Sequence, residues 1–349
     1  MRTFTVDAEG NGDFKTLNEA AEALKGGSEK TLLMIRPGEY FESVVFECSN
    51  LTIEGDTQEV VYISDSNYAR MKDPDGNEWG TFKTAVLRTD GDNIIIRNLT
   101  IENKAGFGFK IGQAVALYSD GNGFLCENCK IIARQDTLFT APLPETNKHG
   151  KNEGFGPKGD LPRTPTRQYF KDCYIEGDID FIFGGASVLF ENCTIFSHDS
   201  VAEHRMKEMI DSVDNDWDGN KSNALRGYVC APSTDEKLEF GYLFLYCHFM
   251  SNCPAGTVYL ARPWRPYGKA YFINCVMDQH IKKELFSDWD NAANRKTCSF
   301  VVAGCRRADG SRIDSGGENS FGKFIDENEA AVYIRRFREF IADSSSDLL

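Results

Sequence analysis

Two aspartates, Asp136 and Asp180, each stand eight residues after a copy of a short motif that recurs along the chain. The motif reads Asn or Asp, then an apolar residue or Cys, a polar residue, and Ile or a similar residue. Its copies begin at Asn50, Asn98, Asn128, Asp172 and Asn192, and weaker copies begin at Tyr246 and Asn274. If each motif marks one coil of a repeating backbone, the two carboxylates lie on neighbouring coils, about 4.8 Å apart along the backbone ladder.

Two carboxylates held that close share a proton, so one pKa rises and the other falls. One residue type then supplies both an acid and a nucleophile. An aspartate inside an apolar strand is costly to bury unless it is paired, which favours a functional role over a hydrogen-bonded ladder residue in the core. Asp178 is a rival to Asp180, because strand alternation puts both on one face. The matched offset favours Asp180.

Two glutamines and an Arg-Pro-Trp cluster add chemistry that suits an ester. The amides of Gln113 and Gln135 can donate to a developing oxyanion without titrating, although solvated surface amides are the alternative. Arg262 can hold a carboxylate with two hydrogen bonds, and Trp264 can stack on a ligand ring. A structural salt bridge and a packed tryptophan are the alternatives here. The sequence has no Gly-x-Ser-x-Gly elbow and no phosphate-binding glycine loop.

Composition narrows the classes of partner and location. The chain of 349 residues is 41% hydrophobic and 26% charged, as in ordinary soluble proteins, and its net charge of −14 argues against nucleic acid as a partner. No apolar run approaches the roughly 20 residues that cross a bilayer. The N-terminus lacks the apolar stretch of a secretory signal. We therefore expect no membrane partner and a cytoplasmic location for the chain as it stands, or an extracellular or periplasmic one if an export signal has been removed.

The cysteines point to an interior stack. Of eleven cysteines, five occupy the second position of the motif: Cys129, Cys173, Cys193, Cys247 and Cys275. Side chains at one position of a repeat stack inside, where a free cysteine behaves as a small hydrophobe. A disulfide framework is therefore not expected. Cys126 and Cys129 form a CxxC without a second pair, and the five histidines are not spaced as ligands, so we expect neither metal nor cofactor.

Short β-rich runs between regular turns describe a parallel β-helix, an all-β solenoid. A β-sandwich is the alternative, but its hairpin signals are scarce. We expect residues 1–349 to form a single catalytic domain. A helix in 14–25 caps the N-terminal end within about 1–25, and another over 327–340 packs outside within a tail of about 322–349. Two polar insertions, about 142–167 and 199–224, are expected to wall a cleft.

The motifs converge on a known family, since the chain resembles the pectin methylesterases (pectinesterases, carbohydrate esterases) over roughly residues 4–290. The matching motifs, in the family's order, are 38–42 (GEYFE), 113–117 (QAVAL), 135–138 (QDTL), 180–184 (DFIFG) and 262–264 (RPW). Residues 227–234 and 277–281 are more similar to the bacterial branch than to the plant one. The chain departs from the pattern at Ala261, where the family usually has glycine.

The resemblance implies a right-handed, single-stranded parallel β-helix of the pectin lyase-like type and an aspartyl esterase that hydrolyses C6 methyl esters of homogalacturonan. Asp180 would be the nucleophile and Asp136 the general acid and then base, so we expect Asp136 to hold the proton at rest. Gln113 and Gln135 would form the oxyanion hole. Arg262 would orient Asp180 and keep it ionised. The positions that would contact substrate are Trp264, Phe183, Phe139 and Met277.

The implied substrate is methyl-esterified polygalacturonate or its oligomers, in pectin catabolism or cell-wall modification, and we expect a monomer. One rival is another β-helix enzyme acting on the same polymer, a lyase or a polygalacturonase. A lyase would need calcium-binding carboxylates, and a glycosidase needs two carboxylates flanking the glycosidic bond. The Gln, Gln, Arg and Trp set suits an ester carbonyl better. A catalytically silent carbohydrate-binding solenoid is the second rival.

Overall fold

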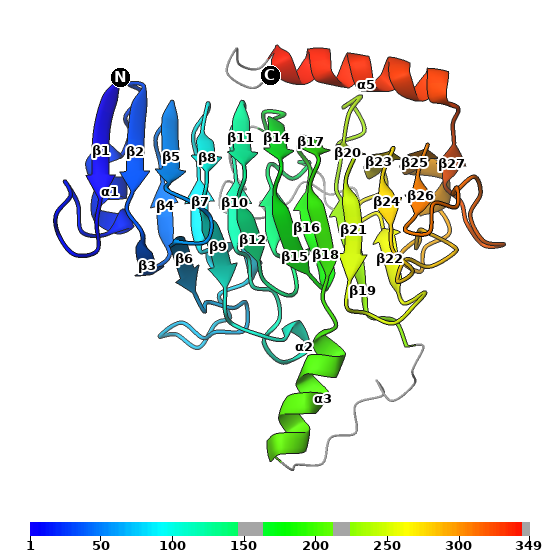
Figure 1. The fold of residues 1–349 in the computed structure, drawn as a ribbon, viewed down its shortest axis with the longest axis horizontal. Coiled ribbons are helices and arrows are strands. Elements are labelled where there is room, and N and C mark those ends of the chain that lie inside the picture. Colours follow the sequence, from blue (N-terminus) through cyan, green and yellow to red (C-terminus); the bar gives the residue numbers. More distant parts are fainter. Residues whose placement is uncertain (146–162, 212–223, 344–349) are drawn as a thin grey trace.

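The chain winds as a right-handed parallel β-helix whose strands stack side by side along one axis (Figure 1). The computed structural model describes residues 1–145, 163–211 and 224–343. Three sheets run along the axis, and the pairings between their strands are parallel. Parallel pairing excludes a β-sandwich, and the predicted fold class is confirmed.

From β2 (Thr31–Ile35) to β22 (Val258–Ala261), each coil contributes one strand to each sheet in turn, and the coils at the two ends contribute fewer. The first sheet consists, in spatial order, of β1 (Arg2–Val6), β2 (Thr31–Ile35), β5 (Leu51–Gly55), β8 (Ile95–Arg97), β11 (Phe124–Glu127), β14 (Arg167–Lys171), β17 (Ser187–Glu191), β20 (Tyr242–Leu245), β23 (Lys269–Ile273), β25 (Ser299–Ala303) and β27 (Lys323–Phe324). The second consists of β3 (Gly38–Phe41), β6 (Val61–Asp65), β9 (Thr100–Asn103), β12 (Lys130–Ile132), β15 (Tyr174–Gly177), β18 (Thr194–Ser197), β21 (His248–Ser251), β24 (Val276–Met277) and β26 (Arg306–Arg307). The third consists of β4 (Val44–Phe46), β7 (Leu87–Thr89), β10 (Leu117–Ser119), β13 (Leu138–Thr140), β16 (Ile179–Gly184), β19 (Gly227–Pro232) and β22 (Val258–Ala261).

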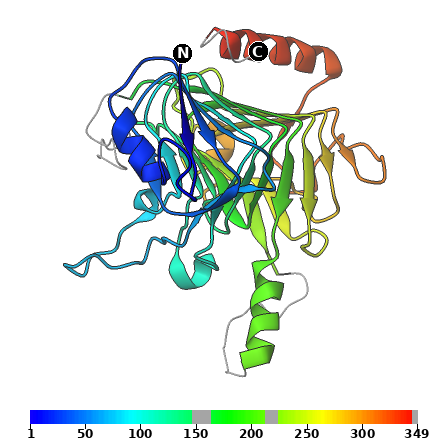
Figure 2. The same cartoon turned by 60° about the vertical axis from the view of Figure 1, so that its left-hand side comes forward.

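Helix α1 (Leu17–Leu24) closes the N-terminal end of the solenoid, and α5 (Glu327–Ala342) covers one outer face, whereas α3 (Ser200–Asp211) projects away from the sheets (Figures 1 and 2). The other helical segments of the described residues are the 3-10 turn Thr81–Lys83, α2 (Gly108–Ile111) and α4 (Asn294–Thr297). Thr16 and Glu19 form a capping box that fixes the start of α1. Asp326 caps α5, whose apolar side packs on the outside of the first sheet, with Tyr333 stacked on Tyr271 at 3.9 Å. Both predicted helices are confirmed.

Helix α3, within the second predicted insertion, was not foreseen, and much of both insertions (146–162 and 212–223) lies outside the described residues. The end of the predicted tail, 344–349, also lies outside them. Within the described parts of the chain, no helix combines the length and apolar character needed to span a membrane.

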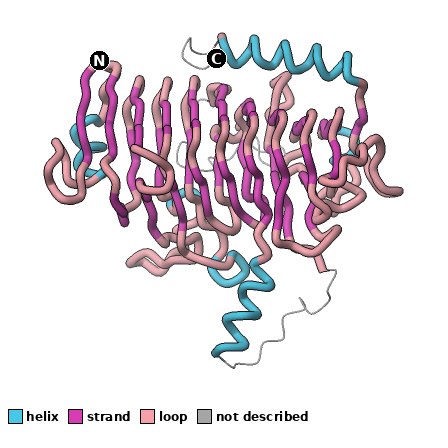
Figure 3. The backbone as a smooth tube through the Cα atoms, viewed as in Figure 1, coloured by secondary structure: helices cyan, strands magenta, loops and turns pink. Residues whose placement is uncertain are grey.

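Strands of successive coils lie side by side and are joined by turns (Figure 3). The repeated Asn or Asp takes the left-handed conformation at the turn between a first-sheet and a second-sheet strand. The residues in this turn are Asn98, Asn128, Asp172, Asn192, Tyr246 and Asn274, with φ between 52° and 58°. Asparagine adopts this region more easily than most residues, which explains the motif. Asn50 is an exception to the predicted stack: it precedes the first-sheet strand β5 and stands beside Asn93, whose side-chain amide donates to it at 2.9 Å.

The motif cysteines lie in the interior, as predicted, and the turn explains why cysteine suits them. The Cys173 thiol donates to the carbonyl of Lys171, two residues back, at 3.3 Å, and to the carbonyl of Cys126 on the preceding coil at 3.4 Å. Cys193, Cys247, Cys275 and Cys305 repeat both contacts. Cysteine is small enough for the stacked interior and carries a weak donor for these carbonyls. We call this row of thiols, from Cys129 to Cys305, the thiol ladder.

The turn predicts how substitutions at Asn128 affect stability. Asn128→Val should lower the free energy of unfolding by roughly 1–3 kcal/mol, since a β-branched residue is strained at positive φ and the bond from its amide to Asn98, 2.7 Å long, is lost. Asn128→Gly should cost less, because glycine adopts this conformation freely. Urea denaturation followed by circular dichroism checks the order; equal midpoints for the two variants would contradict it.

Candidate active site

The parallel ladder between β13 and β16 places the two predicted aspartates opposite each other. Leu138 pairs with Ile182, and the same register two residues earlier aligns Asp136 with Asp180. The backbone NH of Asp136 donates to the carbonyl of Ile179 at 3.0 Å, which ties the two segments together at this level. Both aspartates have positive φ, 64° and 49°. Backbone strain of this kind is common where a side chain must be aimed for function.

Arg262 reaches Asp180 from the end of β22, two strands further along the third sheet. Its Nε donates to Oδ1 at 2.7 Å and its Nη2 to Oδ2 at 2.5 Å, a bidentate pair in which both groups are largely buried. The backbone NH of Arg262 donates to the carbonyl of Cys230 in β19. The guanidinium therefore fixes the plane of the Asp180 carboxylate.

Burial and the neighbouring charges give the two carboxyl groups different pKa values. Burial raises the pKa of Asp180 above its ordinary value, and the two hydrogen bonds and the charge of Arg262 oppose that rise. The sequence predicts that one pKa of the pair falls, and this is wrong: burial outweighs Arg262, so the pKa of Asp180 rises as well. Burial and then the charge of Asp180 raise the pKa of Asp136 well above its ordinary value. Of the two carboxyl groups, Asp136 therefore holds a proton more readily, whereas the bidentate contact with Arg262 favours the ionised form of Asp180.

A cleft of about 250 Å³ opens at this pair. It is lined by Thr81, Phe82, Gln113, Gln135, Asp136, Asp180, Phe183, Ala231, Arg262, Trp264 and Trp289. The structure thus brings together the predicted aspartates, glutamines, arginine, Phe183 and Trp264, and the alanine at 261 does not remove Trp264 from the cleft. Phe139 lies behind the cleft wall, with its ring centroid 4.8 Å from that of Phe183. Met277 does not reach the cleft: it is fully buried in the solenoid interior.

Sequence reasoning missed Phe82 and Trp289 in this lining. Both lie outside the repeat, Phe82 in the 3-10 turn after β6 and Trp289 in the loop before α4. Their positions carry no periodic signal. Aromatic side chains in irregular segments that join consecutive strands were the available hint, but they do not tell which face of the solenoid the segment covers.

Gln135 is held by close packing against α2. A Cβ built on Gly108 would lie 2.4 Å from Oε1 and 2.6 Å from Cβ of Gln135, so only glycine leaves room for this side chain. The Gln135 amide also hydrogen-bonds Asp136 and favours its charged form. The helix therefore fixes the amide beside the two carboxyl groups.

Asp178, the rival carboxylate, does not join the cleft. Its Oδ2 accepts a hydrogen bond from Ser200 at the start of α3, at 2.5 Å, and its Oδ1 accepts one from the backbone NH of Ile179 at 2.6 Å. The positive φ of Asp180 interrupts the alternation that would have put both aspartates on one face. Asp178 nevertheless affects the site, because its charge contributes to the raised pKa of Asp136.

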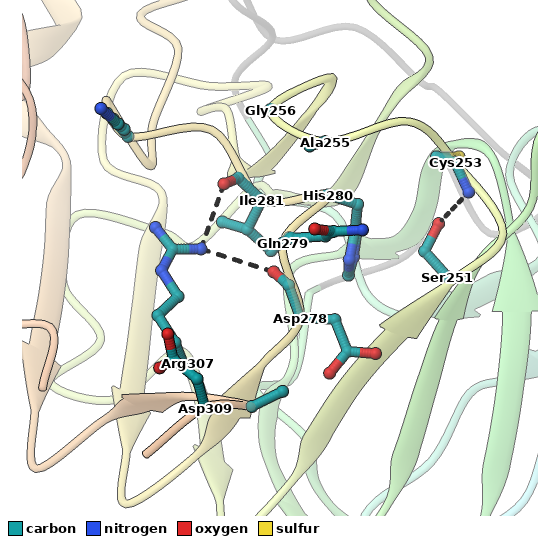
Figure 4. Close-up of a pocket in the computed structure, with 12 residues that line it drawn as sticks. Ser251, Cys253, Ala255, Gly256, Asp278, Gln279, His280, Ile281, Arg307 and Asp309 are labelled. Carbon is teal, nitrogen blue, oxygen red and sulfur yellow. Dashed lines mark hydrogen bonds between the residues drawn. The ribbon is translucent and has the colours of Figure 1, made fainter. Parts of the chain in front are cut away.

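A larger cavity, of about 740 Å³, lies beyond the ends of β21 and β24 (Figure 4). Its wall includes Asp278, His280 and Arg307, and Arg307 Nη1 donates to the carbonyl of Ile281 at 3.1 Å. His248 Nε2 lies 2.9 Å from Asp278 Oδ1, and both ring nitrogens of His280 are shielded from solvent. The two carboxylates in its wall, Asp278 and Asp309, contact His248 and Ser311 respectively, so size alone does not identify the reactive site.

Neither cavity is built around a metal. Within residues 1–145, 163–211 and 224–343, no group of three or more His, Cys, Asp or Glu side chains is arranged to hold an ion. The cleft itself presents two carboxyl groups, one arginine and two side-chain amides.

Known proteins share both the sequence pattern and the fold. A sequence model of the pectinesterase family matches residues 3–144 and 160–303. Pectinesterase 31 of Arabidopsis thaliana is 29% identical over 312 residues, which cover 87% of this chain and 82% of that protein. The fold is similar to that of the pectin methylesterase PemA from Erwinia chrysanthemi, with a TM-score of 0.74 at 22% identity, over 100% of this chain and 98% of that one. A pectin methylesterase in complex with hexasaccharide VII gives a TM-score of 0.71 at 22% identity, with 95% of each chain covered.

The raised pKa of Asp136 predicts that Asp136→Asn is more stable than the wild type near neutral pH. There the unfolded chain has released this proton while the folded chain keeps it, so folding requires proton uptake that asparagine avoids. The gain should vanish as the pH falls below the ordinary pKa of aspartate, where both states are protonated. Asp180→Asn should instead destabilise, because it leaves the buried Arg262 without its anion. Thermal unfolding of both variants between pH 3 and pH 8 checks this; a destabilised Asp136→Asn at neutral pH would contradict it.

Proposed function

The chain belongs to the pectinesterase family, and we propose that Asp180 is its nucleophile and Asp136 its acid and then base. It is a carboxylic ester hydrolase that removes C6 methyl groups from homogalacturonan and releases methanol. The observation that supports these roles is that the two buried carboxyl groups differ in their surroundings. Arg262 holds Asp180 in a bidentate ion pair, whereas Asp136, on the neighbouring coil, keeps its proton.

In the first half of the reaction, a carboxylate oxygen of Asp180 attacks the ester carbonyl carbon. The carbonyl oxygen becomes an oxyanion, which the amides of Gln113 and Gln135 stabilise from the cleft wall. As the tetrahedral intermediate collapses, the bond to the methoxy group breaks and Asp136 gives its proton to the departing methanol. An acyl-enzyme anhydride between Asp180 and the galacturonate remains.

In the second half, Asp136 is a carboxylate and takes a proton from water, which attacks the anhydride at the galacturonate carbon. The bond to Asp180 breaks, so Asp180 returns as a carboxylate beside Arg262 and Asp136 is again protonated. The product acid releases its proton to solvent. Each turn of the cycle consumes one water and one ester, and yields one methanol, one galacturonate and one proton.

The cleft walls suit a pyranose ring. Trp264 and Phe183 meet edge to face with ring centroids 5.9 Å apart. Phe82 also lines the cleft, and its ring centroid lies 4.8 Å from that of Phe139. Sugar rings bind well against such apolar faces while their hydroxyls stay hydrated. A relative of the same fold binds a hexasaccharide, and we propose that methyl-esterified oligogalacturonides occupy this cleft. The monomeric state and the location of the enzyme stay predictions.

The family excludes the rivals raised from the sequence. A lyase or polygalacturonase would act on the glycosidic bond, and a silent sugar-binding solenoid would not need a proton-sharing carboxyl pair. The chain combines the family's sequence pattern with both carboxyl groups, the arginine and the two glutamines in one cleft.

Substitution of either carboxyl should abolish methanol release from methyl-esterified pectin. We expect Asp180→Asn to lower kcat by at least about a thousandfold, since no nucleophile remains, and Asp136→Asn by about a hundred- to ten-thousandfold. The matched control is Asp172→Asn on the same coil, because neighbouring coils carry asparagine at this turn. It should keep wild-type activity. Methanol release by Asp180→Asn at the wild-type rate would refute the assignment.

Gly108→Ala tests the oxyanion role of Gln135. The added methyl group cannot coexist with the present position of Gln135, so we expect kcat to fall by about tenfold or more. The control is Lys110→Ala, an exposed position on the same short helix. Methanol release at saturating substrate and thermal unfolding should be measured together; an unchanged kcat in Gly108→Ala would show that the amide needs no exact placement by α2.

A further inference from the structure

Two aromatic rings enclose the guanidinium of Arg262. The Cζ of Arg262 lies 3.6 Å from the ring centroid of Tyr228 and 3.7 Å from that of Trp289. Two rings can both approach a planar group so closely only from its opposite faces. The edge of the guanidinium stays available and meets Asp180 through Nε and Nη2. We call Tyr228 and Trp289, with Arg262 between them, the arginine clamp.

The loop that carries Trp289 is anchored to the strand that carries Arg262. Ala261, the residue before Arg262, forms a parallel bridge with Phe286, and its carbonyl accepts from the backbone NH of Ser287 at 3.0 Å. The Ser287 hydroxyl in turn accepts from the backbone NH of Trp289 at 3.3 Å. The position of Trp289 over Arg262 is therefore set by backbone pairing.

Trp289 occupies this position at a conformational cost. Its φ is 61°, in the left-handed region that bulky side chains avoid, and Asp290 follows at 55°. The next anchor is Asp288, whose carboxylate accepts from Arg295 Nε at 2.7 Å and whose carbonyl accepts from the Asn294 amide at 3.0 Å. Strained residues held by their surroundings are enriched at sites where a precise orientation matters for function.

Tyr228 is braced from the other side. It pairs in register with Tyr259 on the next strand, and the two rings stack with centroids 5.6 Å apart and an interplanar angle of 12°. Lys282 Nζ lies 5.2 Å from the centroid of the Tyr259 ring. The groups therefore follow one another as Trp289, Arg262, Tyr228, Tyr259 and Lys282. Neither face of the guanidinium can turn without displacing a packed ring.

We propose that Tyr228 and Trp289 are positioning residues that hold the Arg262 guanidinium in the plane of the Asp180 carboxylate and so keep the nucleophile ionised and aimed. This rests on the proposed role of Asp180. Arginine stacks on aromatic faces while its edge makes a bidentate contact. Rings on both faces also exclude water, which strengthens the attraction between guanidinium and carboxylate.

Other ionisable groups also surround this pair. Asp136 and Asp178 lie on the side of β13 and β16, and Cys230 is buried beside Asp180 in β19. Tyr259 and Lys282 lie beyond Tyr228. Asp288 and Asp290 flank Trp289. The pKa of Tyr228 is raised mainly by burial and also by the charges of Asp180 and Asp290, whereas Arg262 lowers it. Nearly all of these groups are unchanged in a variant that removes one ring, so a change in pH dependence would report the clamp.

The test compares Trp289→Leu and Tyr228→Leu with Trp289→Phe and Tyr228→Phe in the full chain. Without a ring, Arg262 can leave the carboxylate plane, the pKa of Asp180 rises, and a higher pH is needed to ionise the nucleophile. The acid limb of the kcat profile for methanol release should therefore move to higher pH in both leucine variants, and kcat at the optimum should fall about ten- to a hundredfold. The phenylalanine variants keep an aromatic face and should restore both.

Phe82→Leu is the matched control, because Phe82 also lines the cleft but touches neither Arg262 nor Asp180 among the contacts described. It should raise KM and leave the acid limb in place. Leucine variants that raise KM alone, with kcat and the acid limb unchanged, would overturn the clamp and make Trp289 a sugar-binding residue. Because Trp289 lies on a surface loop, Trp289→Leu decides alone if Tyr228→Leu does not fold.

The experiments distinguish a failure of the arginine clamp from a failure of the proposed reaction. An active Asp180→Asn overturns the proposed function itself, whatever the clamp variants do. An inactive Asp180→Asn together with wild-type kcat and acid limb in both leucine variants overturns only the clamp.

Discussion

The backbone ladder between β13 and β16 holds the carboxyl groups of Asp136 and Asp180 close together in one largely buried site. The chemistry of the cleft depends on that constraint. Neither group can leave, because each belongs to a strand fixed by its neighbours on both sides. Like charges at this distance cannot both persist, so the surroundings decide which group keeps a proton. Arg262 decides it in favour of an ionised Asp180. An acid and a nucleophile thus follow from coil spacing plus one cation.

Much of this could be predicted from the sequence because a solenoid repeats its local geometry. The asparagine turns, the position of the cysteines and the equal offset of the two aspartates all follow from one coil geometry that repeats. An equal offset in the sequence therefore predicts neighbouring positions in space. The prediction that Arg262, Gln113 and Gln135 share the cleft came from resemblance instead. Residues this far apart in the chain meet because they lie on stacked coils of the third sheet. Those coils differ in length, so no periodicity of the sequence identifies them.

The predictions failed where a residue left the repeat or where one local rule overrode another. Met277 matches a substrate-contacting position of the family, yet strand β24 turns its side chain into the interior. Strand alternation alone assigns Asp178 and Asp180 to one face, but the left-handed backbone of Asp180 turns its own side chain away from that face. Asn50 carries the motif at the wrong corner of its coil. Trp289 lies in a loop whose path depends on a bridge to Ala261, which sequence patterns do not reveal.

Each sulfur of the thiol ladder marks one coil in the interior of the solenoid. These sulfurs lie along the C-terminal part of the axis, buried and directed at carbonyls rather than at solvent. A solenoid loosens by losing contacts between neighbouring coils, so each sulfur becomes reachable only when its own coil has opened. The order in which an alkylating reagent modifies the cysteines would therefore record the order in which the coils separate, and would show whether the catalytic coils open before or after the ends.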